Sequence, residues 1–257
     1  MESVEHWGSS EHEQRDGTIA LIYRPIAAIR STAMTMLVGA FYSDYSGDLL
    51  LATDGATSVR SSETGEWRIE STDTVKSLRL SNEVAFSLSG TLHQINCFLA
   101  HVFHEPSWTK LGSQSPAINI VLENESEYMV PGADRDDLEE QMQAFRLPFP
   151  KKNEGKSLVV MVGGVGRDGR SRVHAWRFFY GRTEIQHEQA QAIFSLHDLA
   201  SEHDITQELT RSADTETCVA SAIHIASREF PNLIGGRATF RRLSNEFVLE
   251  RFQGSAK

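Results

Sequence analysis

Thr35 is the residue of this 257-residue chain whose type and place raise the sharpest chemical question. It lies in the run AMTMLVG, residues 33–39, at the start of an apolar stretch and well inside the chain. A threonine hydroxyl is a weak nucleophile until a base takes its proton, and an N-terminal threonine carries such a base in its own α-amino group, whose ordinary pKa is roughly 7.7 to 8.0. Thr35 is therefore either an ordinary strand residue or, once residues 1–34 are gone, a nucleophile with its own base.

A glycine motif suggests a different chemistry. Gly164, Gly166 and Gly169 spell G-x-G-x-x-G directly after the apolar run SLVVMV, as in dinucleotide-binding oxidoreductases. That fingerprint needs a helix N-terminus to receive the pyrophosphate, whereas the run SRVHAWRFF that follows here alternates like a strand. The glycines therefore predict a hairpin turn and argue against a nicotinamide-dependent oxidoreductase.

Two polar clusters are weaker candidates for ion binding. His101 and His104 stand one helical turn apart with Cys97 nearby, but no further ligand has a recognisable spacing, so ordinary helix histidines are expected. The run DRDD at 134–137 lacks the glycine and the terminal glutamate of a calcium loop and indicates a solvated helix start. We expect neither a metal nor a cofactor.

Composition bounds the class of protein. Hydrophobic residues make up 40% of the chain, enough for a sizeable core, and the formal net charge of -10 argues against a nucleic-acid-binding surface. The one notable basic cluster, RATFRR at 237–242, alternates with apolar residues and predicts the solvent side of a strand. The only cysteines, Cys97 and Cys218, are far apart in sequence and indicate neither a disulfide framework nor a metal knuckle, which fits a reducing compartment.

The N-terminal residues carry no secretory signal. The first seventeen residues are acidic and rich in histidine, with no apolar core. The run TIALIYRPIAAI is interrupted by Arg24-Pro25 and is shorter than the roughly twenty apolar residues that a membrane span needs. We expect a cytoplasmic protein that does not bind a membrane.

Hairpin signals dominate the first ninety residues. Apolar runs on both sides of SDYSGD predict a hairpin over 35–53. Residues 58–71 alternate about a Thr-Gly turn, and residues 76–90 do so about Ser81-Asn82. After Gly90 the period becomes helical, with one apolar face formed by Leu92, Ile95, Phe98, Leu99 and Val102.

The rest of the chain alternates between helical and strand patterns. The runs with these patterns are AINIVL at 117–122 as a possible strand, an acidic helix at 133–145, two strands around a glycine-rich turn at 157–179, a polar and helical region to about Thr210, a helix at 214–230 capped by Asp214 or Thr215, and a last hairpin at 235–252. This order suggests one domain in which two sheets are enclosed by helical layers.

Several of these features fall in a familiar order. Along the chain stand Thr35, Val38-Gly39, Asp54-Gly55, Lys76 and Ser89-Gly90. Over residues 35–104 this order resembles the N-terminal third of proteasome core β subunits and of the related bacterial ATP-dependent peptidase subunit of the HslV type. Residues 157–179 and 214–243 match loosely, and residues 105–156 do not match. The resemblance implies an α+β fold, a four-layer αββα sandwich of two antiparallel sheets flanked by helices, as in N-terminal-nucleophile (Ntn) hydrolases.

The resemblance implies a site with four members. Thr35 would be the nucleophile, and the Lys76 ammonium, held by the Asp54 carboxylate, would raise the local positive potential and keep the amine and hydroxyl poised near neutral pH. The backbone N–H of Gly90, between a strand and a helix, would donate to the oxyanion of the tetrahedral intermediate. Taken singly, the three side chains have ordinary explanations: a strand threonine, a solvated lysine and a turn-forming aspartate.

The chain departs from the family pattern in three places. Met34 precedes Thr35 where family propeptides commonly end in glycine. Ile234, in REFPNLIGG, stands where the family has a supporting serine, so that Glu229 is the only nearby carboxylate, and the Gly-Ser-Gly expected before the last helices is absent. Two functions therefore stay open: a threonine peptidase that acts on peptides or unfolded proteins, or an inactive proteasome-like scaffold or interaction subunit with an internal Thr35.

The resemblance also bears on domain limits and partners. Residues 35–257 would form the proteasome-like domain, and residues 1–34 an N-terminal extension. That extension is either a propeptide or the product of a mis-assigned start, with Met34 as the initiator that is removed because threonine is small. By resemblance alone, a homo-oligomeric ring is expected, with an ATP-dependent unfoldase as a possible partner.

Overall fold

The computed structural model describes residues 35–42, 48–61, 63–111, 116–148, 157–187, 192–195, 200–211, 214–243 and 249–253. The N-terminal extension expected at 1–34 lies outside the described residues.

One sheet carries the strand that follows Thr35. Its strands, in spatial order, are β10 (Ala192–Phe194), β1 (Leu37–Phe41), β2 (Leu49–Thr53), β11 (Thr239–Leu243) and β12 (Leu249–Gln253). All neighbours are antiparallel, with Leu37 opposite Thr53 across β1 and β2. The pairing expected over 35–53 is thereby confirmed, as is the last hairpin.

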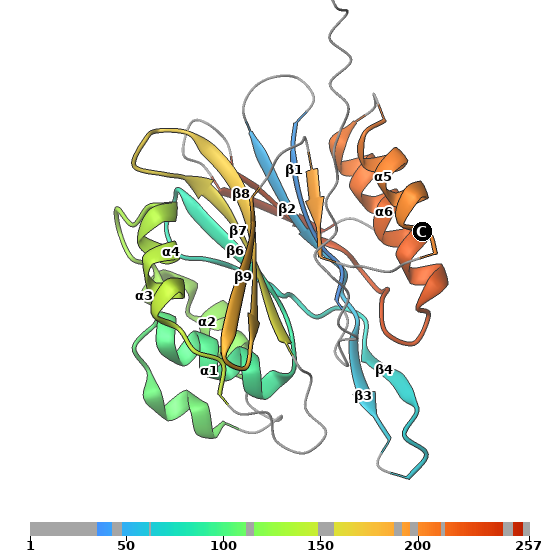
Figure 1. Ribbon diagram of the computed structural model, residues 1–257, viewed down its shortest axis with the longest axis horizontal. Coiled ribbons are helices and arrows are strands. Elements are labelled where there is room, and N and C mark those ends of the chain that lie inside the picture. Colours follow the sequence, from blue (N-terminus) through green and yellow to red (C-terminus); the bar gives the residue numbers. More distant parts are fainter. Residues whose placement is uncertain are drawn as a thin grey trace, which may run out of the picture.

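A second antiparallel sheet carries the strand that follows Lys76. Its strands, in spatial order, are β5 (Ser77–Arg79), β6 (Val84–Ser89), β7 (Ser157–Val165), β8 (Ser171–Phe179) and β9 (Arg182–His187). The glycine-rich turn between β7 and β8 joins two antiparallel strands, as predicted, and Gly169 has a left-handed φ of 73° that glycine adopts without strain. A separate two-stranded ribbon, β3 (Thr57–Arg60) with β4 (Trp67–Ser71), projects from the body in Figure 1.

Helices lie in two groups on opposite sides of the sheets (Figure 1). The first group comprises α1 (Leu92–Val102), a 3₁₀ helix (Pro106–Lys110), α2 (Ala117–Glu123), α3 (Glu125–Tyr128) and α4 (Arg135–Ala144), and the second comprises α5 (Glu202–Leu209) and α6 (Thr215–Glu229). The side chain of Thr91 caps α1 and that of Asp214 caps α6 by accepting backbone N–H bonds, which satisfies donors that a helix start leaves free.

Three apolar clusters hold these elements together. The first contains Phe86 and Phe178 of the second sheet packed with Phe98 of α1, and the second contains Val38 of β1 packed with Ile223 of α6. The third joins the two sheets, with Leu51 of β2 beside Met161 of β7. The result is a mixed fold of antiparallel sheets and helices.

Two expectations for secondary structure were wrong. The run AINIVL forms α2 rather than a strand, because Ala117, Ile118 and Val121 are buried on one helical side and the Ala117 N–H binds Asn96 Oδ1 of α1 at 3.0 Å. The polar region before Thr210 holds β9 and β10 ahead of α5 instead of being helical throughout, since the neighbouring strands β8 and β1 supply the partners that a short polar strand needs.

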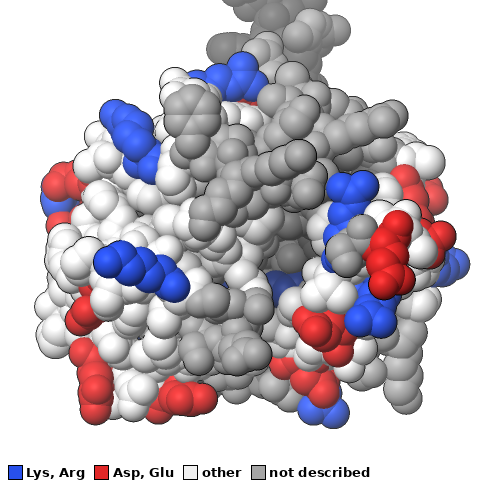
Figure 2. Space-filling model, turned by 90° about the horizontal axis from the view of Figure 1, so that it is seen from below, with Lys and Arg blue, Asp and Glu red and all other residues white. Residues whose placement is uncertain are grey.

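The expected solvent side of RATFRR was wrong for Arg241, whereas Arg237 is exposed and Arg242 is partly exposed as expected. Arg241 is only 1% exposed, because β11 pairs on both edges and this side chain points between the two sheets beside Leu51 and Leu243. On the face drawn in Figure 2, the described basic residues stand among acidic ones without forming one broad patch. Among the described residues, no helix combines the length and the apolar character needed to cross a membrane.

Candidate functional site

Thr35 is the first described residue and leads directly into β1. Only 8% of it is exposed. Its carbonyl oxygen accepts a hydrogen bond from Ser195 Oγ at 3.1 Å, and the same oxygen of Ser195 accepts from the Leu37 N–H at 2.9 Å. The start of β1 is thus clamped by a residue 160 positions later in the chain.

Asp54 follows β2 and is fully buried. Its carboxylate accepts backbone N–H bonds from Met36 at 3.0 Å, from Ala56 at 3.1 Å and from Gly235 at 3.2 Å. These three N–H donors offset the desolvation cost of burying the Asp54 carboxylate. Asp54 therefore ties the start of β1 to the segment after β2 and to the approach to β11.

Lys76 stands immediately before β5 and is also buried. Its Nζ lies 3.0 Å from Thr35 Oγ1 and 3.3 Å from Asp54 Oδ1, and it also donates to the carbonyl of Ala56. One ammonium therefore bridges the Thr35 hydroxyl and the Asp54 carboxylate.

Burial and pairing act against each other in this ion pair. Burial raises the pKa of Asp54, opposed by Lys76 and by the N–H groups of Gly235 and Ala56. Burial likewise lowers the pKa of Lys76, opposed by Asp54. An ammonium that Asp54 holds beside the Thr35 hydroxyl in this buried site acts on it more strongly than a solvated one would.

The expected convergence of Thr35, Asp54 and Lys76 is confirmed by these distances. Gly90 stands between β6 and the Thr91 cap of α1, where a Cβ atom would come within 2.9 Å of Leu158 Cδ1 and 3.1 Å of Gln94 Oε1. A larger residue there would have to displace the ends of these two flexible side chains, and the role of the Gly90 N–H as an oxyanion donor stays a prediction.

Two contributors to the site were missed by sequence reasoning. Ser195 follows the short strand β10 and lies in the stretch where the family pattern predicts a Gly-Ser-Gly, but it has no flanking glycines. Gly235 contributes its backbone N–H, while Ile234, in the place expected for a serine, is buried in the core under α6. Glu229 lies outside the site, because its carboxylate accepts bonds from Ser201 and Ala200 ahead of α5.

The turn before β11 offers a test of how tightly this site is built. Gly236 has a φ of 74°, and a Cβ atom there would meet the Thr72 carbonyl oxygen at 2.3 Å, whereas Gly132 has a φ of 77° with open space around it. Gly132→Ala should cost about 1–2 kcal/mol for the left-handed backbone alone. Gly236→Ala should cost clearly more because the backbone must also shift. Urea unfolding of both variants measures the difference, and equal losses would contradict the close packing.

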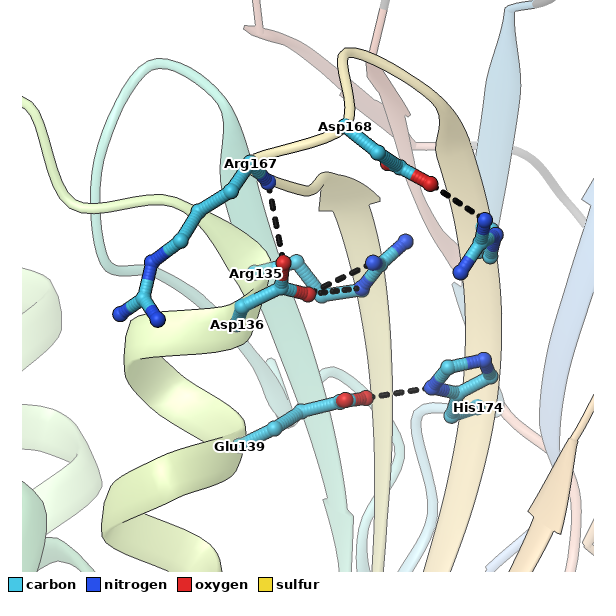
Figure 3. A pocket seen from close by; sticks show the side chains of 7 residues that line it. Arg135, Asp136, Glu139, Arg167, Asp168 and His174 are labelled. Atoms are coloured by element: carbon cyan, nitrogen blue, oxygen red, sulfur yellow. Dashed lines mark hydrogen bonds and ion pairs between the residues drawn. The ribbon is translucent and has the colours of Figure 1, made fainter.

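A second polar cluster lies between α4 and the turn that joins β7 to β8 (Figure 3). Asp136 accepts from the Arg135 guanidinium at 2.6 Å and from the Arg167 N–H at 3.0 Å, and Glu139 pairs with His174. A helix starts at DRDD as predicted, with Asp134 as its cap, but this start is not solvated throughout because Arg135 is only 2% exposed. The carboxylates drawn there hold protein cations or N–H groups, so the cluster joins α4 to the sheet.

The histidines and the cysteine of α1 are held by other contacts. His101 Nε2 lies 2.9 Å from the Gln141 carbonyl oxygen, and Cys97 Sγ lies 3.7 Å from His93 Nε2. In the part of the chain that the structure describes, no group of three or more His, Cys, Asp or Glu side chains is placed to hold a metal ion.

Comparison with solved structures shows a likeness of fold. The crystal structure of eukaryotic HslV from Trypanosoma brucei is similar over 81% of this chain and 99% of that chain, with 11% sequence identity and a TM-score of 0.49. No protein-family model matches the chain, and no curated protein matches it in sequence. A likeness at this TM-score and identity concerns the fold and gives no information about activity.

Proposed function

We propose that this protein is a threonine peptidase of the proteasome type, in which Thr35 becomes the first residue and acts as the nucleophile. The observation that carries the proposal is the position of Lys76 Nζ, 3.0 Å from Thr35 Oγ1 and 3.3 Å from the buried Asp54 carboxylate. An ammonium that a carboxylate holds beside a hydroxyl can help to activate that hydroxyl as a nucleophile. The fold that goes with it is the four-layer αββα sandwich of Ntn hydrolases.

In this mechanism the Thr35 hydroxyl attacks the carbonyl carbon of a peptide bond while the Thr35 α-amine takes the hydroxyl proton. The oxyanion would accept from the Gly90 N–H. The amine of the cleaved peptide leaves with the proton, and an ester to Thr35 remains until water, deprotonated by the α-amine, hydrolyses it. The Lys76 ammonium favours the neutral, proton-accepting form of the α-amine, because like charges close together disfavour protonation.

The activity requires a free amine on Thr35. While Met34 is attached, the Thr35 nitrogen belongs to an amide and cannot act as a base. Two routes would free it: the Thr35 hydroxyl attacks its own preceding carbonyl and releases residues 1–34, or translation starts at Met34 and that methionine is removed. We favour the second route, since MTMLVG has the form of a natural start and Met34 is not the glycine expected at a cleavage junction.

The second candidate is an inactive proteasome-like subunit that serves as a scaffold. The burial of Ile234 where a supporting serine is expected, and the use of Glu229 ahead of α5, favour it. For the peptidase, the assembly proposed from the sequence resemblance is a homo-oligomeric ring in the cytoplasm, with an ATP-dependent unfoldase as a candidate partner. Such a ring would restrict access to the site to extended chains.

The test compares two versions of the chain, one beginning at Met1 and one at Met34, by intact mass and by hydrolysis of a panel of fluorogenic peptides. We expect the version from Met34 to lose its methionine, to begin at Thr35 and to hydrolyse peptides. A version from Met1 that keeps residues 1–34 should be inert, and hydrolysis by that species would refute the mechanism. A folded chain that begins at Thr35 and hydrolyses nothing would establish the scaffold.

A further inference from the structure

Arg241 carries a charge in the interior of the protein, behind the candidate site. Its guanidinium donates from Nε to Ser77 Oγ at 3.1 Å and from Nη2 to the Ser77 carbonyl oxygen at 3.0 Å. The same Nη2 lies 2.9 Å from Glu125 Oε1 at the start of α3. Arg241 therefore joins β11 of one sheet to β5 of the other.

The residue held in this way is the immediate neighbour of Lys76. Ser77 begins β5, and the Lys76 carbonyl accepts the Leu88 N–H of β6 at 2.9 Å. β5 is a three-residue strand at the edge of its sheet and pairs with β6 alone among the described strands. A short edge strand with one partner is weakly fixed by its own ladder, so the contact from Arg241 supplies a second support at the position where Lys76 leaves the strand.

The arginine fork suits this contact better than any other side chain. Its planar donors can bind the hydroxyl and the carbonyl of one residue and a carboxylate at the same time, which lysine cannot do. Only 1% of Arg241 is exposed, and a buried cation is expensive unless it is paired and hydrogen-bonded. The hydrogen bonds to Ser77 offset the desolvation of the buried guanidinium. Contacts that converge on one residue in this way fit a side chain whose role is to fix the position of that residue.

We propose that Arg241 is a positioning residue that holds Lys76 at the Thr35 hydroxyl by fixing Ser77. Its effect on catalysis rests on the proposed function, whereas its effect on Lys76 does not. Arg242 is the matched control because it lies next in β11 and points to the opposite side of the sheet, where its Nε donates to Asp48 at 2.9 Å and its guanidinium lies over the Tyr42 ring. It has no described contact with Ser77.

The first experiment measures kcat, KM and the pH profile of peptide hydrolysis for Arg241→Met and Arg242→Met. We expect Arg241→Met to lower kcat by about 10- to 100-fold, the scale of a displaced catalytic group, with little change in KM. Its acidic limb should move to higher pH, because a displaced ammonium no longer disfavours protonation of the α-amine. Arg242→Met should leave kcat and the acidic limb unchanged. Equal profiles for both variants would overturn the proposal.

The second experiment does not need activity. The Lys76 ammonium is titrated by NMR in the chain labelled with nitrogen-15 on lysine, assigned with Lys76→Met, in the wild type and in both arginine variants. A changed Lys76 titration in Arg241→Met alone supports the positioning role even if the wild type hydrolyses no peptide, in which case only the proposed function fails. If Arg241→Met does not fold, Arg241→Lys and Ser77→Ala replace it, and an unchanged Lys76 titration in both would refute the role.

Discussion

Replacing Thr35 by alanine is expected to abolish peptide hydrolysis, by at least about 10⁴-fold, while the protein still folds and assembles. The hydroxyl would be the attacking atom, and in enzymes where nucleophile and base act as a unit the loss of one removes the benefit of the other. The Thr35 hydroxyl receives a hydrogen bond only from Lys76 among the described residues, so its removal disturbs little of the core. Thr35→Ser keeps the hydroxyl and should retain measurable hydrolysis.

Thr53 provides the matched control for this experiment. It lies opposite Leu37 across β1 and β2, is fully buried, and its hydroxyl has no hydrogen-bond partner in the described part of the chain. Thr53→Val should leave hydrolysis within a few-fold of the wild type. Activity is measured with fluorogenic peptides after intact mass has shown that each chain begins at residue 35. Hydrolysis by Thr35→Ala at the wild-type rate would exclude Thr35 as the nucleophile.

The elements that sequence could predict are those whose partners lie close along the chain. The hairpins of β1 with β2 and of β5 with β6 are joined by short turn-forming segments, and α1 has an unbroken helical period with a capping box at Thr91. Local pattern also placed Thr35, Asp54 and Lys76 next to strands. Pairing of β1 with β2 brings Thr35 and Asp54 together, but Lys76 precedes β5 of the second sheet and reaches them only through the packing of the two sheets, which local pattern does not reveal.

The elements that sequence could not predict depend on distant partners. β10 has three residues, and it forms because β1, more than 150 positions earlier, offers an edge. The helix α2 looks like a strand by composition, and its contact with Asn96 of α1 decides otherwise. The same holds for Arg241, since nothing in its local alternation says that β11 would be covered on the face that it occupies.

The residues of the candidate site also divide into those that local sequence could predict and those that depend on distant partners. Ser195 and Gly235 reach it through hydrogen bonds to Thr35 and Asp54 over 160 and 181 positions of sequence, so no local motif could mark them. Ser195 could have been found by asking which serine lies between a late strand and the last helices, without demanding the flanking glycines.

Replacing Lys76 by methionine is expected to lower kcat by about 10²- to 10³-fold, the range found when one preorganised electrostatic group is removed from an active site. Methionine is about as long as the apolar part of lysine and can occupy the same buried space, but it leaves Asp54 with only its backbone donors. The variant should therefore still fold, and urea unfolding should show a lower free energy of unfolding than in the wild type. Lys110, exposed in the 3₁₀ helix, is the control, and Lys110→Met should change neither property.

The pH profile separates an electrostatic role of Lys76 from a merely structural one. In the wild type the Lys76 ammonium disfavours a second positive charge beside it, so the α-amine of Thr35 has a lowered pKa and is free to accept a proton at lower pH. In Lys76→Met that pKa rises toward its ordinary value of roughly 7.7 to 8.0, and the acidic limb of kcat should move to higher pH. A fall in kcat with an unmoved acidic limb would mean that Lys76 only packs against Thr35. An unchanged kcat would show that peptide hydrolysis does not depend on the contact between Lys76 Nζ and Thr35 Oγ1, and it would refute the mechanism proposed from that contact.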